Sequence, residues 1–182
     1  YLTGSSNTLI QYYSELAQRL VERFNLGPGV IVIDIGSNDG TFLKAFQSLG
    51  MHVLGIEGAS KASEIAVAEG IPVIERFFGK GIASSVKASL PKEGIKLILA
   101  MNVLAHTDNI NEFLTEVMEL MEPDTAFVSQ SHWLMALIRK FEFDTIYHEH
   151  LRYYTLHSLM QLFERHGLSI GDAEITDFYG GS

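Results

Sequence analysis

Residues 143–154 hold the densest group of side chains that could do chemistry, with tyrosines, acids and histidines in no helical or strand pattern. Such a break in pattern is typical of a functional site. His150 is of the residue type that most readily moves a proton near neutral pH. A carboxylate such as Glu149 can orient an imidazole, and the hydroxyl of Tyr147 can hydrogen-bond a developing oxyanion. The stretch therefore indicates proton transfer.

Two other interpretations of this stretch remain open. His148 and His150 could share one face of an extended segment and bind a metal ion together with His106 or His132. The stretch could also be a surface loop in which the histidines occur by chance. Because neighbouring side chains point to different faces of a strand or helix, a metal site is less favoured than proton transfer, and we expect none.

A second group of such residues lies in the loop that follows a short β-branched run. Two glycines in residues 34–40 permit a tight turn and close approach of a ligand to the backbone. The glycine spacing is not that of a dinucleotide-binding loop, and the two carboxylates would repel a pyrophosphate but hold an ammonium group. S-Adenosylmethionine carries an ammonium and a sulfonium and no phosphate, so the loop predicts this cofactor. The loop residues expected to bind it are Asp34, Gly36, Ser37, Asn38, Asp39 and Gly40.

Further cofactor contacts are expected where later strands end. Glu57 can accept hydrogen bonds from both hydroxyls of an unphosphorylated ribose. Phe77 and Phe78 could cover an adenine face, although a core position is the commoner one for phenylalanine. Asn102 is expected beside the cofactor, and His106 follows it at the rim where the methyl donor should end.

The elements that must position these residues alternate between strands and helices. The alternation predicts a Rossmann-like, doubly wound α/β fold with a mostly parallel sheet, which binds ligands at the carboxyl ends of its strands. His132 and Trp133 follow the fifth strand, where they could line an acceptor pocket or pack in the core. The strands are expected at residues 30–35, 52–57, 71–74, 96–101, 126–130 and about 168–176, and the helices at 9–24, 40–49, 60–69, 81–90, 110–121 and 158–166.

Composition limits the classes of partner. The 182 residues carry a formal net charge of −9, which repels phosphate backbones, so we expect no nucleic-acid partner. There is no cysteine, which fits a reducing cytoplasm, and no apolar run reaches the roughly 18 residues of a membrane helix. We expect residues 1–182 to form one domain acting on a small molecule, with a leading helix within residues 1–25 and an active-site segment at residues 140–157.

The loop at residues 34–40, the stretch 102–106 and residues 143–151 together resemble the class I S-adenosylmethionine-dependent methyltransferases that C-methylate nucleotide-linked sugars. The resemblance implies that a base removes a proton beside a ketone of a deoxysugar and that the enolate then takes the methyl group. It makes His150 the base, has Tyr147 and Glu149 bind the sugar and settle the enolate, and lets His106 assist. It also gives Tyr1 a substrate contact.

The chain departs from this family in several ways. We expect the zinc-binding and carboxy-terminal domains that flank the core of the relatives to be absent from residues 1–182, and the sheet to lack its last strand. Tyr179 stands where the family usually has histidine. Two alternatives therefore stay open, namely an O- or N-methyltransferase of a small metabolite, and a non-catalytic module that only binds S-adenosylmethionine.

Overall fold

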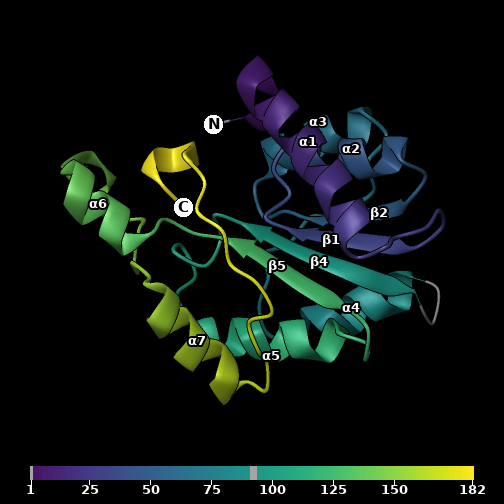
Figure 1. Ribbon diagram of the computed structural model, residues 1–182. Helices are drawn as coiled ribbons and strands as arrows, with labels where there is room; N and C mark the ends of the chain where they lie inside the picture. Colours follow the sequence, from purple (N-terminus) through teal and green to yellow (C-terminus); the bar gives the residue numbers. More distant parts are fainter. Residues whose placement is uncertain (1, 91–93) are drawn as a thin grey trace.

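The fold is built on a five-stranded parallel sheet with the order β3-β2-β1-β4-β5 (Figure 1). It is seen in a computed structural model that describes residues 2–90 and 94–182, so Tyr1 lies outside the described residues. Strand order reverses between β1 and β4, where open α/β sheets bind their ligands. The doubly wound α/β prediction is confirmed. The strands are Ile31–Ile35 (β1), His52–Ile56 (β2), Val73–Ile74 (β3), Ile95–Met101 (β4) and Ala126–Gln130 (β5).

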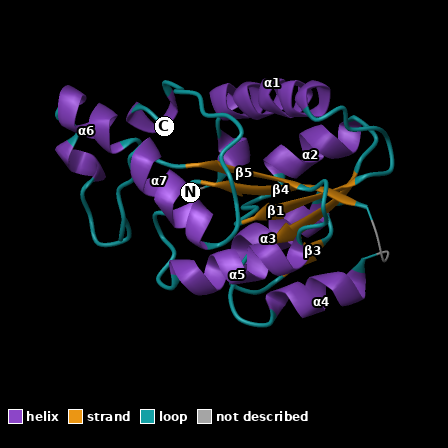
Figure 2. Ribbon diagram, turned by 60° about the horizontal axis from the view of Figure 1, so that its bottom comes forward, coloured by secondary structure: helices purple, strands orange, loops and turns teal. Residues whose placement is uncertain are grey.

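Helices cover both faces of the sheet, with α1 and α2 on one face and α4 and α5 on the other (Figure 2). The helices are Asn7–Arg23 (α1), Thr41–Ser48 (α2), Ser60–Ala68 (α3), Ile82–Ser89 (α4), Ile110–Leu120 (α5), Leu134–Lys140 (α6) and Leu156–Arg165 (α7). Three short 3-10 turns are Thr3–Ser5 (η1), Phe143–Thr145 (η2) and Phe178–Gly180 (η3). No helix among the described residues has the length and apolar character needed to cross a bilayer.

Strand β1 shows why an apolar run followed by a polar loop places a site at the edge of the sheet. Ile31, Ile33 and Ile35 pack into the core beneath α4 and α5, whereas Val32 packs into the core beneath α1 and α2. Successive side chains of a strand point to opposite faces, so Asp34 lies on the same face as Val32. The strand therefore carries a buried carboxylate on the α1 and α2 side, directly before the glycine loop.

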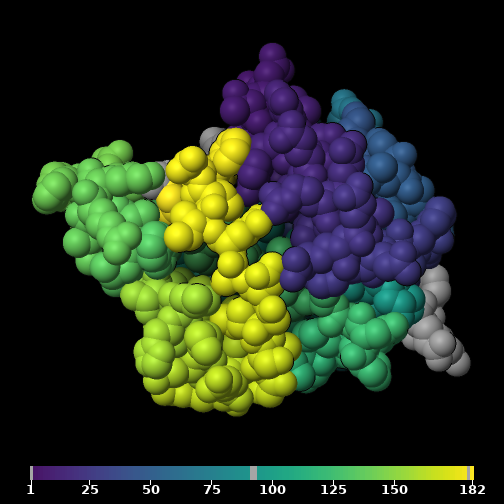
Figure 3. Space-filling model, viewed as in Figure 1, coloured from purple at the N-terminus to yellow at the C-terminus, as the bar shows by residue number. Residues whose placement is uncertain are grey.

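The strand expected at residues 168–176 is wrong. These residues, all within the described part of the chain, form no strand, and residues 171–175 are exposed. The segment crosses beside α1, where Glu174 pairs with Arg19 and Asp172 with Arg23. Thr176 instead exchanges two backbone hydrogen bonds with Ser182. Figure 3 shows this carboxy-terminal segment (yellow) between α6 (green) and α1 (purple).

Helix α6 was not expected from the sequence. It has seven residues and no side-chain cap at Trp133, so the usual start signal is missing. Tertiary contacts replace that signal, because the backbone N–H of Leu134 donates to the carbonyl of Tyr154 at 2.8 Å. The helix ends where Phe141 adopts a left-handed conformation with φ of 56°.

Candidate active site

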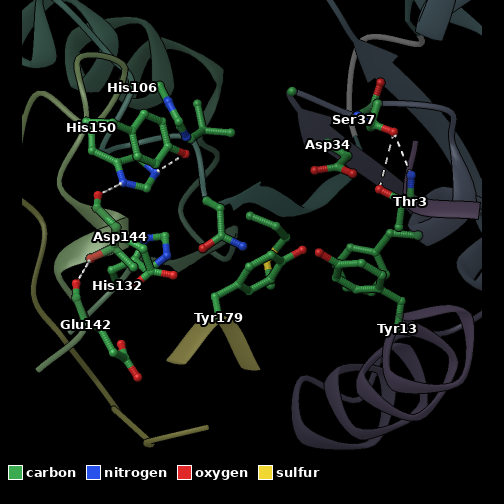
Figure 4. A pocket seen from close by; sticks show the side chains of 18 residues that line it. Thr3, Tyr13, Asp34, Ser37, His106, His132, Glu142, Asp144, His150 and Tyr179 are labelled. Atoms are coloured by element: carbon green, nitrogen blue, oxygen red, sulfur yellow. Dashed lines mark hydrogen bonds between the residues drawn. The ribbon is translucent and has the colours of Figure 1, made fainter. Parts of the chain in front are cut away.

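A cavity of about 570 Å³ opens at the carboxyl ends of the central strands (Figure 4). One side is formed by the 34–40 loop, η1 and α1, and the other by residues that follow β4 and β5 and by the 140–157 segment. In Figure 4 the histidines lie across the cavity from Asp34 and Tyr13. The lining residues include Thr3, Tyr13, Asp34, Gly36, Ser37, Asn38, Asn102, His106, His132, Glu142, Asp144, Thr145, Tyr147, His150 and Tyr179.

The two glycines of the 34–40 loop have specific conformational roles. Gly36 has φ of 72°, and a Cβ atom there would lie 2.7 Å from a methyl carbon of Val103. Gly40 has φ of 76° at the start of α2, where a Cβ atom would crowd Ile71 at 3.0 Å. Any larger residue would be strained at either position. The two glycines therefore let the loop backbone pack closely against Val103 and Ile71.

Asp34 is the buried charge of the cavity. Asp34 is only 3% exposed, and its Oδ1 atom has no hydrogen-bond partner among the described residues. Burial, and after it the nearby Glu57 carboxylate, raises the pKa of Asp34 well above its ordinary value. The hydroxyl oxygen of Ser37 is also buried and has no partner among the described residues. A cationic hydrogen-bond donor in the cavity would supply the partner that Asp34 lacks.

Asp39, one of the two loop carboxylates predicted to bind the cofactor, accepts hydrogen bonds from within the chain. One of its carboxylate oxygens accepts from the backbone N–H of Gly4 at 2.7 Å, and the other accepts from the Thr41 hydroxyl at 2.6 Å. Its neighbour Asn38 accepts from the backbone N–H of Thr3 at 3.0 Å. Asp39 therefore links η1 to the start of α2, whereas Asp34 keeps an oxygen that has no partner among the described residues.

The hydrogen bonds of Asp39 to Gly4 and Thr41 predict the effect of Asp39→Ala. We expect the free energy of unfolding to fall by about 1–2 kcal/mol, because a helix-start acceptor and a loop tie are both lost. Binding of S-adenosylhomocysteine should weaken less than in Asp34→Asn. Urea unfolding and calorimetry measure the two quantities. If affinity for S-adenosylhomocysteine falls as much in Asp39→Ala as in Asp34→Asn, Asp39 also binds the cofactor.

The structure also places the other residues predicted to bind the cofactor. The Glu57 carboxylate accepts from the backbone N–H groups of Asn38 at 2.9 Å and Ala59 at 2.7 Å, which leaves further lone pairs on both oxygens. Phe77 is 83% exposed and lies over Gly58, next to Glu57. Phe78 instead packs on Phe113 in the core, with ring centroids 4.8 Å apart.

Asn102 is held in an uncommon conformation at the end of β4. Its φ is 58°, and its backbone N–H donates to the carbonyl of Gln130 at 2.9 Å. Its side-chain oxygen is buried, lines the cavity and has no partner among the described residues. Asn102 thus offers a hydrogen-bond acceptor between the loop and the histidines.

At the far side of the cavity, His150 lies between two other histidines. Its ring centroid is 4.8 Å from that of His106 and 4.7 Å from that of His132. Its Nδ1 lies 2.7 Å from the carbonyl oxygen of Thr145, which can only accept, so the proton sits on Nδ1. Its Nε2 is then an acceptor, and the Tyr147 hydroxyl donates to it at 3.0 Å.

Backbone and side-chain bonds hold the 140–157 segment against the loop after β4. The backbone N–H of Leu151 donates to the carbonyl of Ala105 at 2.9 Å, and the Tyr154 hydroxyl donates to that of Leu104 at 3.3 Å. The Arg152 guanidinium donates to the carbonyls of Thr107 and Asp108. These contacts explain why His150 and His106 meet, although the sequence separates them widely.

The two flanking histidines have lowered pKa values, but their surroundings differ. Burial, followed by the neighbouring His150, lowers the pKa of His106, and a hydrogen bond to the Glu149 backbone carbonyl partly offsets this. Burial, followed by His150 and then His106, lowers the pKa of His132. The Glu149 carboxylate is exposed and lies 3.9 Å from His148, outside the cavity lining. Within residues 2–90 and 94–182, no group of three histidine, cysteine, aspartate or glutamate side chains is arranged to hold a metal ion.

Comparison with known proteins identifies the family. A family described as a methyltransferase domain matches residues 8–171. The chain belongs to this methyltransferase family. The C-methyltransferase NovU of Streptomyces niveus is 33% identical over 100% of this chain and 43% of its own length. A ubiquinone biosynthesis O-methyltransferase of Rhodopseudomonas palustris (strain BisA53) is 30% identical over 52% of this chain and 37% of its own.

A solved structure shares the fold of the methyltransferase domain. Magnesium protoporphyrin IX methyltransferase of Synechocystis PCC 6803, solved with bound S-adenosylhomocysteine, gives a TM-score of 0.63 at 17% identity, covering 92% of this chain and 77% of that one. The chain spans less than half the length of the curated relatives it matches. Family membership confirms the expected S-adenosylmethionine-dependent methyltransferase core.

The polar groups that line the cavity of the methyltransferase domain fit S-adenosylmethionine. Asp34, Ser37 and Asn102 each present a buried oxygen that has no partner among the residues that the structure describes. All three line the same cavity as Gly36, the first glycine of the loop. These acceptors match the ammonium and hydroxyl donors of an adenosyl amino acid.

Sequence reasoning missed several residues that line the cavity of the methyltransferase domain. Thr3 carries no sequence signal that separates it from surface residues, and Glu142 and Asp144 were expected only as members of the 140–157 segment. Tyr13 lies on the buried face of α1, where the helical pattern indicates only a core position. Tyr179 lines the cavity with φ of 54°, a conformation that bulky residues seldom adopt.

Proposed function

We propose that this domain is the core of a C-methyltransferase that deprotonates the carbon next to a ketone of a nucleotide-linked deoxysugar and methylates the resulting enolate. The observation that carries the proposal is His150, whose Nε2 is an available acceptor at the cavity and whose Nδ1–H is fixed by Thr145. The identity with the C-methyltransferase NovU, which runs along the whole chain, supports the same reaction class.

In this proposal the loop side of the cavity binds S-adenosylmethionine. Asp34 accepts from the ammonium group, Glu57 from the ribose hydroxyls, and Asn102 lies beside them, while Phe77 covers one face of the adenine. The bound cofactor supplies a methyl group that its sulfonium makes electrophilic. Among the residues lining the cavity there is no lysine or arginine, so the diphosphate of a nucleotide-sugar would lie outside it.

The histidine side of the cavity then performs the proton transfer. The Tyr147 hydroxyl turns from Nε2 of His150 to the carbonyl oxygen of the acceptor, and Nε2 takes the proton from the neighbouring carbon. The Thr145 carbonyl stabilises the imidazolium through Nδ1–H. The electron pair of the broken C–H bond passes into the enolate, whose carbon would take the methyl group as the sulfur–methyl bond breaks and S-adenosylhomocysteine is released. His106 lies beside His150 and assists it. The exposed Glu149 would contact the part of the sugar that extends outside the cavity.

The test is hydrogen exchange at the acceptor. The full-length protein, with S-adenosylhomocysteine and thymidine diphosphate-linked 4-keto-6-deoxyglucose in D₂O, should replace a proton beside the ketone with deuterium, as followed by NMR. With S-adenosylmethionine the product should carry a methyl group on carbon. An O-methyltransferase, the activity named for the Rhodopseudomonas relative, would transfer methyl to a hydroxyl without exchange. A cofactor-binding module would bind S-adenosylhomocysteine and do neither.

A further inference from the structure

His132 is a buried histidine that the mechanism above does not use. It follows β5 directly, is 9% exposed and lines the cavity. Its ring packs 4.7 Å from that of His150 and meets the Tyr179 ring edge-on at 6.1 Å. No hydrogen bond to its ring nitrogens is present among the described residues. Because His132 lines the cavity, these nitrogens are available to a ligand there.

Two backbone hydrogen bonds fix the residues that follow His132. The backbone N–H of Trp133 donates to the carbonyl of Gly181 at 2.9 Å, and that of Leu134 donates to the carbonyl of Tyr154 at 2.8 Å. The first bond ties the residue after His132 to the carboxy-terminal turn, and the second ties the next residue to the segment that carries His150. His132 and His150 are therefore held in a set relation.

The other two donors near His150 already have roles. The His106 ring interacts with the Glu149 backbone carbonyl, and the Tyr147 hydroxyl bonds to Nε2 of His150 and turns to the acceptor in the proposed reaction. His132 is the flanking imidazole that is buried and has no such bond. Since burial and the neighbouring histidines lower its pKa, its ring stays neutral at pH 7 and keeps one N–H donor. A neutral histidine is an effective hydrogen-bond donor to a developing enolate.

We propose that His132 is a further catalytic residue, whose ring N–H donates a hydrogen bond to the acceptor's carbonyl oxygen as it becomes the enolate oxygen. The inference rests on the proposed function. His150 Nε2 gains the proton from the α-carbon, the electron pair of that C–H bond forms the enolate, and the N–H proton of His132 stays on its nitrogen. His132 thus stabilises the charge that His150 generates, from the next ring in the same cluster.

The test compares His132→Phe, which keeps a flat ring without a donor, with His132→Gln, which keeps an N–H donor. Deuterium exchange into thymidine diphosphate-linked 4-keto-6-deoxyglucose is followed in D₂O with S-adenosylhomocysteine bound. Exchange should fall about 100-fold in His132→Phe, the usual cost of removing one oxyanion donor, and recover at least tenfold in His132→Gln. Affinity for S-adenosylhomocysteine and thermal stability should stay near wild type. His157→Phe, an exposed change on α7, is the matched control.

The outcomes separate this inference from the proposed function. If the wild type shows no exchange, the proposed function fails and this inference fails with it. If the wild type exchanges and His132→Phe exchanges equally fast, only the role of His132 is overturned. If both His132 variants are equally slow while binding S-adenosylhomocysteine normally, the donor is irrelevant and the hydrogen-bond role is also overturned.

Discussion

Replacing His150 with asparagine is expected to slow exchange of the acceptor's α-proton by about 10²- to 10⁴-fold, the range that a general base contributes. The side-chain amide can still donate to the Thr145 carbonyl, so the local fold should survive. What disappears is Nε2, the acceptor at the cavity. Because His150 lies across the cavity from Asp34, affinity for S-adenosylhomocysteine should change by less than about threefold. NMR of the acceptor in D₂O measures the exchange rate.

His148→Asn is the matched control, since it makes the same change two residues earlier. The His148 side chain is 90% exposed and does not line the cavity, so we expect exchange at the wild-type rate. Tyr147→Phe should give an intermediate loss, because the base remains while one hydroxyl donor is removed. Wild-type exchange in His150→Asn would mean that another group removes the proton. An equal loss in His148→Asn would place the base outside the cavity seen here.

Much of the fold follows from local sequence patterns, but its last part does not. Strand β1 is an apolar run that can only be buried on both faces, and the glycine loop after it ends the strand. Residues 168–176 carry apolar side chains at Leu168, Ile170 and Ile175, yet a strand also needs a hydrogen-bonding neighbour. There the backbone of Thr176 pairs with Ser182, and ion pairs hold the segment beside α1. Local propensity cannot reveal which partner a segment finds.

The same limit applies within the candidate site. Asp34 and Asp39 are both acids of one loop, and their spacing does not tell which carboxylate faces the cavity. The difference arises from the docking of η1, whose Gly4 N–H engages Asp39, and from Thr41 at the start of α2. His150 was predictable because its neighbours break every regular pattern. Tyr13 was not, because a tyrosine on the buried face of a helix usually only packs.

Asp34→Asn is expected to change cofactor binding and stability in opposite directions. Asparagine keeps the shape but cannot carry the charge that an ammonium group needs, so affinity for S-adenosylhomocysteine should fall about 10- to 100-fold. The ligand-free protein should become more stable, since a buried carboxylate with an unpartnered oxygen is replaced by a neutral group. A gain of about 1 kcal/mol would raise Tm by about 2–4 °C in a protein of this size. Calorimetry and thermal unfolding measure the two effects.

The pH dependence gives this prediction its sign. Because burial and Glu57 raise the pKa of Asp34 in the folded chain, the folded state holds a proton that the unfolded chain loses near pH 3.8. The stability contributed by Asp34 is therefore complete below that pH and lost as the pH rises through the raised pKa. The advantage of Asp34→Asn should be largest above the raised pKa and vanish toward pH 3.8. Asp124→Asn should instead make the protein less stable above pH 3.8, and this loss should vanish as the pH falls. The reason is that the hydrogen bond to Lys96 lowers the pKa of Asp124. If Asp34→Asn binds S-adenosylhomocysteine as tightly as the wild type, Asp34 does not bind the cofactor. If Asp34→Asn is less stable than the wild type at neutral pH, Asp34 has a partner in the ligand-free protein.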